Sequence, residues 1–243
     1  MSKEIKVKKK TKLYEDKTIV VFETDNEDYF IQEFSDDAIA PDGSKKGKIK
    51  GKGAINNQLS GHMFNYLESY HVPSHFIQPQ SENTMIVRKL EMIPVEVFVR
   101  NIATGTLVKK YGVEEGKELE RPILEFYLKD DSKKDSLINS DDLISFEYAT
   151  ADEVQQIERY ARKTNAVLRS YFHRRNMLLV DFKLEFGHSK SGKIKLGAGV
   201  NPDTCNLWDI CSNNTFDKNR FRQDSAKGEE ALNEIYNRIL GSN

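Results

Sequence analysis

The chain has 243 residues, 38% of them hydrophobic and 31% charged, which is typical of a globular protein and excludes a disordered chain. Its 37 basic and 38 acidic residues leave a net charge of −1, so we expect no long-range attraction to polyanions and no nucleic-acid partner. The apolar runs are too short for a transmembrane helix, and the first residues lack the apolar core of a signal peptide, so we expect a cytoplasmic protein without a membrane partner.

The first third of the chain is predicted to be rich in β-structure. Residues 18–23 and 29–34 are strand-like runs, and the residues between them favour a turn. The basic residues at the start of the chain are interpreted as a solvated tail, with a nucleic-acid-binding arm as the alternative.

A helix and two further strands are predicted next. From residue 54 the apolar positions repeat every three or four residues, which predicts a helix. Residues 84–87 and 95–99 are expected to be strands on either side of a connector at 90–94. The backbone of such a connector is a place where a nucleobase could bind.

The second half of the chain is predicted to contain two long helices. Thr150 and Glu153 have the spacing of a capping box, which marks the start of one helix. The other covers about residues 225–240. Early strands followed by later helices, with hairpins throughout, predict an α+β fold.

One strand carries the clearest pattern of a functional site. Asp181, Lys183 and Glu185 alternate with apolar residues, so their side chains point to the same face of the strand. Carboxylates are ligands for hard cations such as Mg²⁺, and a nearby lysine can hold a phosphate or a developing negative charge. A solvated row of ion pairs is the alternative, but the apolar flanks favour a buried site.

The cysteines and histidines predict neither a disulfide nor a zinc site. Cys205 and Cys211 are the only cysteines and are interpreted as reduced, structural thiols. The five histidines form no pair with the spacing of zinc ligands.

Three further segments admit two interpretations each. The segment from Arg100 to Thr106 could bind a phosphate or be a capped turn at the end of a strand. The glycine-rich residues 50–53 and the mixed-charge residues 129–135 are interpreted as solvated loops when each is considered alone.

Six segments, taken together, resemble the phosphoribosylaminoimidazole-succinocarboxamide synthase (SAICAR synthetase) family. They occur in the order and spacing of the family over nearly the whole chain: GKGAINNQLS (51–60), PVEVFVRNIATGTLVKKYGVEEG (94–116), EFYLKDD (125–131), LVDFKLEFG (179–187), NPDTCNLWD (201–209) and DKNRFRQD (217–224).

The resemblance implies a fold, a division into lobes and a reaction. It implies an α+β fold in which a β-rich nucleotide-binding lobe with a kinase-like hinge, residues 1–93, packs on a larger substrate and metal lobe, residues 94–243. It implies an ATP-dependent and Mg²⁺-dependent ligase of purine biosynthesis that joins the ribotide CAIR to L-aspartate. A homo-oligomer is also expected.

The resemblance assigns five residues to the nucleotide and its metal. Met92 in the hinge would meet the adenine through its backbone. Lys17 would lie in the loop that covers the phosphates, and Lys129 and Asp135 would line the nucleotide side. Glu185 matches a magnesium ligand of the family.

Five more residues are assigned to the reaction and the ribotide. Lys183 matches a lysine beside the reacting phosphate, and Asp181 matches another polar position, so both are expected to be catalytic. Arg100 and Thr106 match the positions that bind the ribotide phosphate. Arg222 matches a further substrate-binding position.

The chain departs from the family at several positions of the same cleft. After the strand that carries Asp181 and the short hairpin that follows it, Ala198-Gly199 replaces the usual Asp-Glu. Ile19 replaces the second lysine of the phosphate loop, and Asn206 replaces the arginine before Leu-Trp-Asp. Three hypotheses follow. The chain is an active ligase of this type, or it is an impaired or re-purposed relative that binds a nucleotide or ribotide without forming the amide. The third is an ATP-using ligase or kinase that acts on a different substrate, which would explain the loss at Asn206 but not the loss at Ala198.

Overall fold

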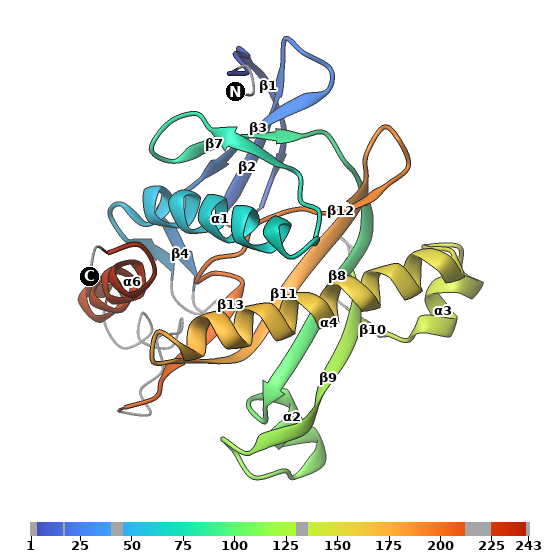
Figure 1. The fold of residues 1–243 in the computed structure, drawn as a ribbon, viewed down its shortest axis with the longest axis vertical. Coiled ribbons are helices and arrows are strands. Elements are labelled where there is room, and N and C mark those ends of the chain that lie inside the picture. Colours follow the sequence, from blue (N-terminus) through green and yellow to red (C-terminus); the bar gives the residue numbers. More distant parts are fainter. Residues whose placement is uncertain (1–3, 17, 40–45, 130–135, 212–224, 242–243) are drawn as a thin grey trace.

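The computed structural model describes residues 4–16, 18–39, 46–129, 136–211 and 225–241. It contains two large antiparallel sheets joined by the segment between β7 and β8 (Figure 1).

The first sheet is formed by the N-terminal part of the chain. Its strand order is β1-β2-β3-β7-β6. The strands are β1 (Lys9–Glu15), β2 (Ile19–Thr24), β3 (Tyr29–Phe34), β6 (Phe76–Pro79) and β7 (Thr84–Arg88). Helix α1 (Lys52–Ser69) packs against this sheet, and a short ribbon of β4 (Asp37–Ile39) and β5 (Lys46–Lys48) lies beside it (Figure 1).

The second sheet contains the long central strands. Its order is β10-β9-β8-β11-β12, and β13 also pairs with β11. The strands are β8 (Glu91–Ile102), β9 (Glu118–Leu128), β10 (Ser136–Ile138), β11 (Met177–His188), β12 (Ile194–Leu196) and β13 (Cys205–Asp209). Helix α4 (Ala151–His173) crosses one face of this sheet (Figure 1).

Three helices complete the described fold. Helix α2 (Thr106–Tyr111) follows β8, helix α3 (Ser140–Ser145) precedes α4, and helix α6 (Ser225–Leu240) contacts α1. The mixture of helix and sheet confirms the predicted α+β class.

The start of α4 confirms the predicted capping box. The Thr150 backbone N–H donates to the Glu153 carboxylate at 2.7 Å, and the Glu153 backbone N–H donates to the Thr150 hydroxyl at 3.3 Å. These bonds satisfy two donors that a helix start otherwise leaves unpaired. The apolar stripe of α4 is buried, as the periodicity predicts.

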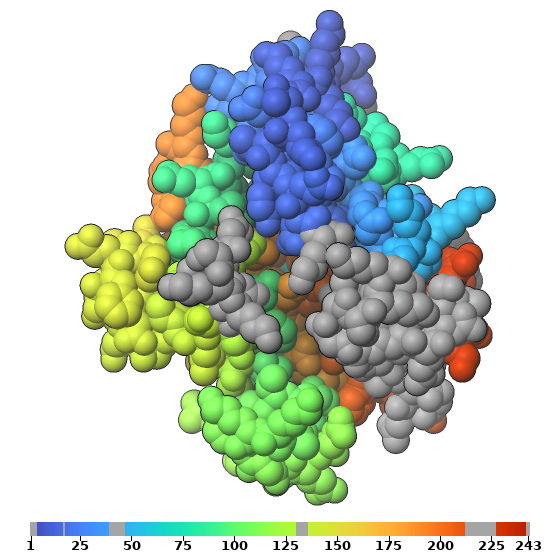
Figure 2. Space-filling model, turned by 180° about the vertical axis from the view of Figure 1, so that it is seen from behind, coloured from blue at the N-terminus to red at the C-terminus, as the bar shows by residue number. Residues whose placement is uncertain are grey.

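The alternation along β11 determines which face of the second sheet is open. Phe182, Leu184 and Phe186 are at most 2% exposed and belong to the main core, which α4 covers. Asp181 and Lys183 lie on the other face and are only half-buried. In the view from behind, this face is visible between the N-terminal strands and the region of α2 (Figure 2).

Two expectations about the first lobe are wrong. The basic start of the chain is not a tail, because Lys9–Glu15 forms edge strand β1, paired with β2. An exposed edge strand rich in lysine has no apolar alternation to reveal it, and lysine is common at such edges. The connector at 90–94 is not separate either, because β8 already begins at Glu91 and pairs with β11 there.

We expect Thr150→Ala to lower the free energy of unfolding by about 1 kcal/mol, because the substitution removes one side of the capping box. Urea denaturation measures this difference. Thr150→Ser is the matched control and should retain most of the stability. Equal losses in the two variants would show that the hydroxyl does not stabilise the helix.

Candidate active site

An apolar slot of about 180 Å³ lies between the first sheet and the start of β8. Its walls include Ile19, Val21, Phe30, Leu90 and Met92. The side chain of Met92 is 42% exposed and reaches towards the backbone of Gly187 and Gly197, where an added Cβ would lie 3.0 and 3.1 Å from Met92 atoms. Glycine at these two positions therefore leaves room for Met92 in the wall.

The slot ends at an ion pair. The Lys129 ammonium donates to the Glu185 carboxylate at 2.8 Å, and both residues line the slot. Burial lowers the pKa of Lys129, but the attraction of Glu185 outweighs burial and the net pKa is raised. Lys129 is thus a fixed positive charge at the polar end of an apolar slot. This arrangement suits a flat apolar group that carries an anionic tail.

A second ion pair lies next along the same face. The Lys183 ammonium donates to the Glu96 carboxylate at 2.7 Å, and the Glu96 side chain is 11% exposed. Burial lowers the pKa of Lys183, whereas Glu96 and then Glu185 raise it, with a net increase. Lys183 therefore stays protonated, which suits it to stabilise negative charge but not to act as a base.

Asp181 faces β8 and β13 at the far end of the row. Its carboxylate accepts from the Asn206 amide at 3.2 Å and from the Thr104 hydroxyl at 3.4 Å. Asn206, noted as a departure from the family, therefore lies in contact with a predicted catalytic residue. Its own Oδ1 is buried and has no hydrogen-bond partner in the described part of the chain.

Arg100 is placed opposite Asp181 by the register of β8 and β11. Its Nε donates to the Glu125 carboxylate at 2.7 Å, and its Nη2 lies 3.5 Å from the Tyr127 hydroxyl. A guanidinium carries five N–H donors, so these contacts leave others for a ligand. Thr106 is exposed at the start of α2, after Gly105, whose φ of 53° favours glycine.

The loop between β12 and β13 has no carboxylate at Ala198 or Gly199 and is tightly filled there. A Cβ at Gly199 would lie 2.7 Å from the Asn201 amide nitrogen and 3.3 Å from both Phe34 and Ser60. The Asn201 amide cannot easily move, because it donates to the Ser60 hydroxyl at 2.9 Å while its oxygen accepts from the Asp203 backbone at 2.8 Å. Gly199 and Asn201 are therefore parts of one packing arrangement.

The same loop contains Asp203, whose buried ion pair the sequence analysis missed. The Asp203 carboxylate accepts from the Lys52 ammonium at 2.5 Å and from the Asn56 amide at 2.7 Å. The expectation that residues 50–53 are a solvated loop is wrong for Lys52, which is 5% exposed. The spacing of Lys52 and Asn56, four residues apart in the motif that starts α1, is the signal that could have revealed a shared face.

His75 is a second residue that the sequence analysis did not select. It lines the slot, is 5% exposed, and its buried Nε2 has no partner among the described residues. Burial lowers the pKa of His75 to about 3, although a hydrogen bond with the backbone of Ala198 opposes the shift. The ring is therefore neutral at physiological pH. Gln32 also donates to the Ala198 carbonyl, at 2.9 Å.

The outcome for the predicted site residues is mixed. Asp181, Lys183 and Glu185 share one face, and Met92 and Lys129 lie with Glu185 around the slot. Three other predicted residues lie outside the described part of the chain, namely Lys17, Asp135 and Arg222.

Among the described residues, no group of three or more His, Cys, Asp and Glu side chains could hold a metal ion. None of the described helices is long and apolar enough to cross a membrane.

Comparisons with known proteins agree on one family. Residues 12–239 match the family described as SAICAR synthetase. The phosphoribosylaminoimidazole-succinocarboxamide synthase of Chloroherpeton thalassium is 47% identical over 236 residues, which cover 97% of this chain and 100% of that protein. The enzyme of the same name from Chlorobium chlorochromatii is 46% identical and covers 96% of this chain and 98% of its own.

Solved structures are similar over the same extent. The phosphoribosylaminoimidazole-succinocarboxamide synthase of Ehrlichia chaffeensis has a TM-score of 0.91 at 33% identity, covering 96% of this chain and 100% of that one. A SAICAR synthetase in complex with ADP has a TM-score of 0.89 at 43% identity, covering 94% and 97% of the two chains.

We expect Gly199→Ala to destabilise the protein by roughly 1–3 kcal/mol, because the added methyl group overpacks the buried space against Asn201. In the Asn201→Ser background the same substitution should have a clearly smaller effect. A double-mutant cycle in urea measures this coupling. Additive effects would show that Asn201 does not close the space beside residue 199.

We expect His75 to make the protein less stable as the pH falls below 6.5. The unfolded chain takes up a proton near the ordinary pKa of 6.5, whereas the folded chain does so only near 3. The free energy of unfolding should therefore fall by roughly 1 kcal/mol per pH unit in this window.

Urea denaturation between pH 7 and 5 measures this slope, and His75→Gln should flatten it. His62, whose pKa burial also lowers, contributes in the same direction and remains in both proteins. The exposed His71 provides the control variant His71→Gln. An unchanged slope in His75→Gln would contradict the assignment.

Proposed function

The chain belongs to the SAICAR synthetase family, and from this premise we propose that it is an ATP-dependent ligase of purine biosynthesis. It would join CAIR and L-aspartate to give SAICAR, ADP and phosphate. The observation that carries the proposal is the apolar slot that ends at Lys129 and Glu185, with Lys183 next along the same face. A family relative of 43% identity is a complex with ADP, which supports a nucleotide in this slot.

The slot can accommodate the adenine ring of ATP. Its apolar walls offer contact to both faces of a flat base, and the backbone around Met92 offers polar groups to the base edge. The phosphates would then extend towards Lys129. The Lys129 ammonium must turn from Glu185 to meet them, an exchange of one anionic partner for another.

We assign the ribotide to the part of the face that contains Arg100. The N–H groups of Arg100 not bound to Glu125 would hold the ribotide phosphate, and the Thr106 hydroxyl would add a further donor. The Glu125 carboxylate keeps the guanidinium oriented before the ligand arrives, because Nε is fixed at 2.7 Å.

The reaction mainly requires positioning and charge stabilisation. A carboxylate is a poor electrophile, so its phosphorylation by ATP is followed by attack of the aspartate amine and loss of phosphate. Lys183, held by Glu96, would stabilise negative charge on the transferred group and on the tetrahedral intermediate. Asp181 is proposed to orient the ribotide or the amine through its carboxylate.

We propose that Mg²⁺ accompanies ATP and neutralises its phosphates. Glu185 is a hard oxygen donor at the polar end of the slot and is the described residue that would hold the ion. Phosphate oxygens and water would complete the ligand set, because Ala198 and Gly199 offer no carboxylate. The chain therefore fits a metal that the nucleotide brings with it.

Three further proposals follow from the sequence analysis. We retain a nucleotide-binding lobe of residues 1–93 and a larger lobe of residues 94–243, although the boundary falls inside β8. A homo-oligomer and a cytoplasmic location also stay predictions, and light scattering of the purified protein tests the first.

The second candidate function is binding without amide formation. The observation in its favour is the filled space beside Gly199, which leaves no room for the carboxylate that the family pattern has at that position. Turnover decides between the two functions.

We expect the purified protein, supplied with ATP, Mg²⁺, CAIR and L-aspartate, to release ADP and form the succinocarboxamide. Mass spectrometry detects the product, and a coupled assay measures ADP. Lys183→Met should lower kcat about 100-fold or more, because it removes charge stabilisation from the transition state.

Lys163→Met, at a half-buried position of α4 on the opposite side of the sheet, is the matched control and should leave kcat unchanged. Absence of product, with nucleotide binding still detected by calorimetry, would refute the ligase and favour the binding function. Absence of both would refute the assignment of the slot.

A further inference from the structure

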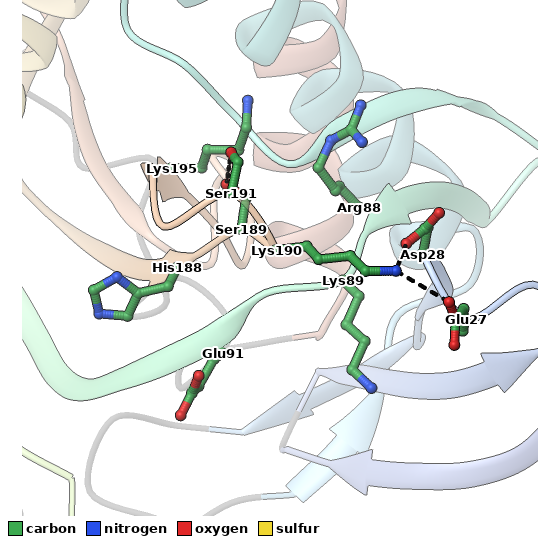
Figure 3. A pocket seen from close by; sticks show the side chains of 10 residues that line it. All are labelled: Glu27, Asp28, Arg88, Lys89, Glu91, His188, Ser189, Lys190, Ser191 and Lys195. Atoms are coloured by element: carbon green, nitrogen blue, oxygen red, sulfur yellow. Dashed lines mark hydrogen bonds and ion pairs between the residues drawn. The ribbon is translucent and has the colours of Figure 1, made fainter.

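A second, larger hollow of about 580 Å³ lies outside the proposed substrate cleft (Figure 3). Three separate segments form it: the turn between β2 and β3, the segment joining β7 to β8, and the hairpin between β11 and β12. The two lobes thus both contribute to its walls. Its volume is in the range of pockets that bind small molecules.

The segment joining β7 to β8 separates this hollow from the apolar slot. Leu90 and Met92 line the slot, whereas Lys89 and Glu91 line the hollow, and Arg88 borders both. This alternation is that of an extended backbone, whose successive side chains point to opposite sides. The hollow is therefore a separate space on the other side of one wall.

Part of the charge around the hollow is already neutralised. The Lys190 ammonium in the hairpin lies 3.0 Å from the Glu27 carboxylate and 3.2 Å from that of Asp28, as the dashed lines in Figure 3 show. His188 lies 3.4 Å from the Glu153 carboxylate of α4. These contacts account for the two acidic residues of the β2–β3 turn that line the hollow, Glu27 and Asp28.

Arg88, Lys89 and Lys195 line the hollow without a carboxylate partner among the described residues, and of the three Lys89 is exposed. The Cζ of the Arg88 guanidinium lies 5.9 Å from the Tyr29 ring centroid. Lys195 donates to the backbone carbonyl of Ser74 at 3.3 Å. Both side chains are half-buried, and in Figure 3 they extend to the same side of the hollow. Lys89 and Glu91 extend to the other side in that view.

Both positive and negative charges lie around Lys195, and their net effect with burial disfavours its charged form. Burial lowers the pKa of its ammonium, and the positive charges of Arg88 and Lys193 lower it further. Glu68 opposes the shift but is bound to Ser74, whose backbone N–H and hydroxyl both donate to its carboxylate. An anion between the two cations would relieve their repulsion.

We propose that this hollow binds a compact tetrahedral oxyanion of the phosphate class between Arg88 and Lys195. A guanidinium can donate two parallel hydrogen bonds to such a group, and an ammonium can approach a third oxygen. The Ser191 hydroxyl in the same wall is exposed and adds a donor. The site uses none of the residues assigned to the ligase reaction.

The remaining walls limit the size and charge of the ligand. Glu27, Asp28 and Glu91 line the same hollow and would repel an extended polyanion such as a nucleic acid. One phosphate group fits beside Arg88 and Lys195, either as the free ion or as the phosphate of a small sugar. The polar walls beyond it would suit the hydroxyls of such a sugar.

Titration calorimetry with inorganic phosphate and with ribose 5-phosphate tests the proposal. We expect a saturable component in the wild-type protein that Lys195→Gln weakens at least tenfold. Lys89→Gln is the matched control, since Lys89 lines the same hollow on its other side, and it should change the affinity less than twofold. Equal binding by wild-type protein and Lys195→Gln would overturn the proposal.

The comparison of the two ligands identifies the source of the phosphate. Tighter binding of ribose 5-phosphate that depends on Lys195 would support a sugar phosphate, and equal binding would support the free ion. Phosphate that binds in the proposed substrate cleft does so equally in the wild-type protein, Lys195→Gln and Lys89→Gln. It therefore does not affect the difference in affinity between them.

A crystal of the wild-type protein soaked in selenate provides a second measurement that needs no variant. The anomalous signal of selenium should lie between Arg88 and Lys195. Signal elsewhere, with none at this place, would refute the site even if Lys195→Gln were too unstable to test.

Discussion

The antiparallel pairing of β8 with β11 is the constraint on which the proposed active site depends. It sets Asp181 opposite Arg100 and Glu185 opposite Glu96, so charged residues far apart in the sequence share one face. The same alternation places Phe182 and Leu184 in the core under α4. A shift of one residue in this pairing would bury the charges and expose the apolar residues, so the core protects the geometry of the site.

The cations on this face of the sheet are also paired with carboxylates. Lys129, Lys183 and Arg100 each have a carboxylate partner, on Glu185, Glu96 and Glu125. A half-buried cation without a partner would be costly to desolvate, and its partner also holds it in position. Lys183 and Arg100 can be used by a ligand while these partners stay in place. In the proposed function Lys129 would exchange its partner, which would couple nucleotide binding to the release of Glu185.

In the loop between β12 and β13, the surrounding side chains require a residue that departs from the family pattern. Gly199 is required because Asn201, Ser60 and Phe34 occupy the space of its side chain. Asn201 in turn is held by the loop that brings Asp203 to Lys52 and Asn56. A carboxylate at residue 199 therefore cannot be accommodated without a change at residue 201. The two candidate functions differ in whether this cleft catalyses amide formation without that carboxylate.

The sequence by itself determined the periodic elements and the family. The capping box at Thr150, the stripe of α4 and the alternation along β11 are local patterns, and each appears in the structure as predicted. Six motifs in register were enough to indicate the α+β fold and the type of reaction. Local periodicity and motif order survive in one dimension, so the chain alone reveals them.

Only the tertiary structure decided which residues meet. Edge strand β1 has no apolar alternation, and the pairing of Glu91 with His188 depends on a strand almost a hundred positions away. The partners of Lys183 and Lys52, the neutral His75 and the filled space at Gly199 arise from contacts between distant segments. Burial and charge pairing are properties of such contacts, and sequence spacing carries no record of them.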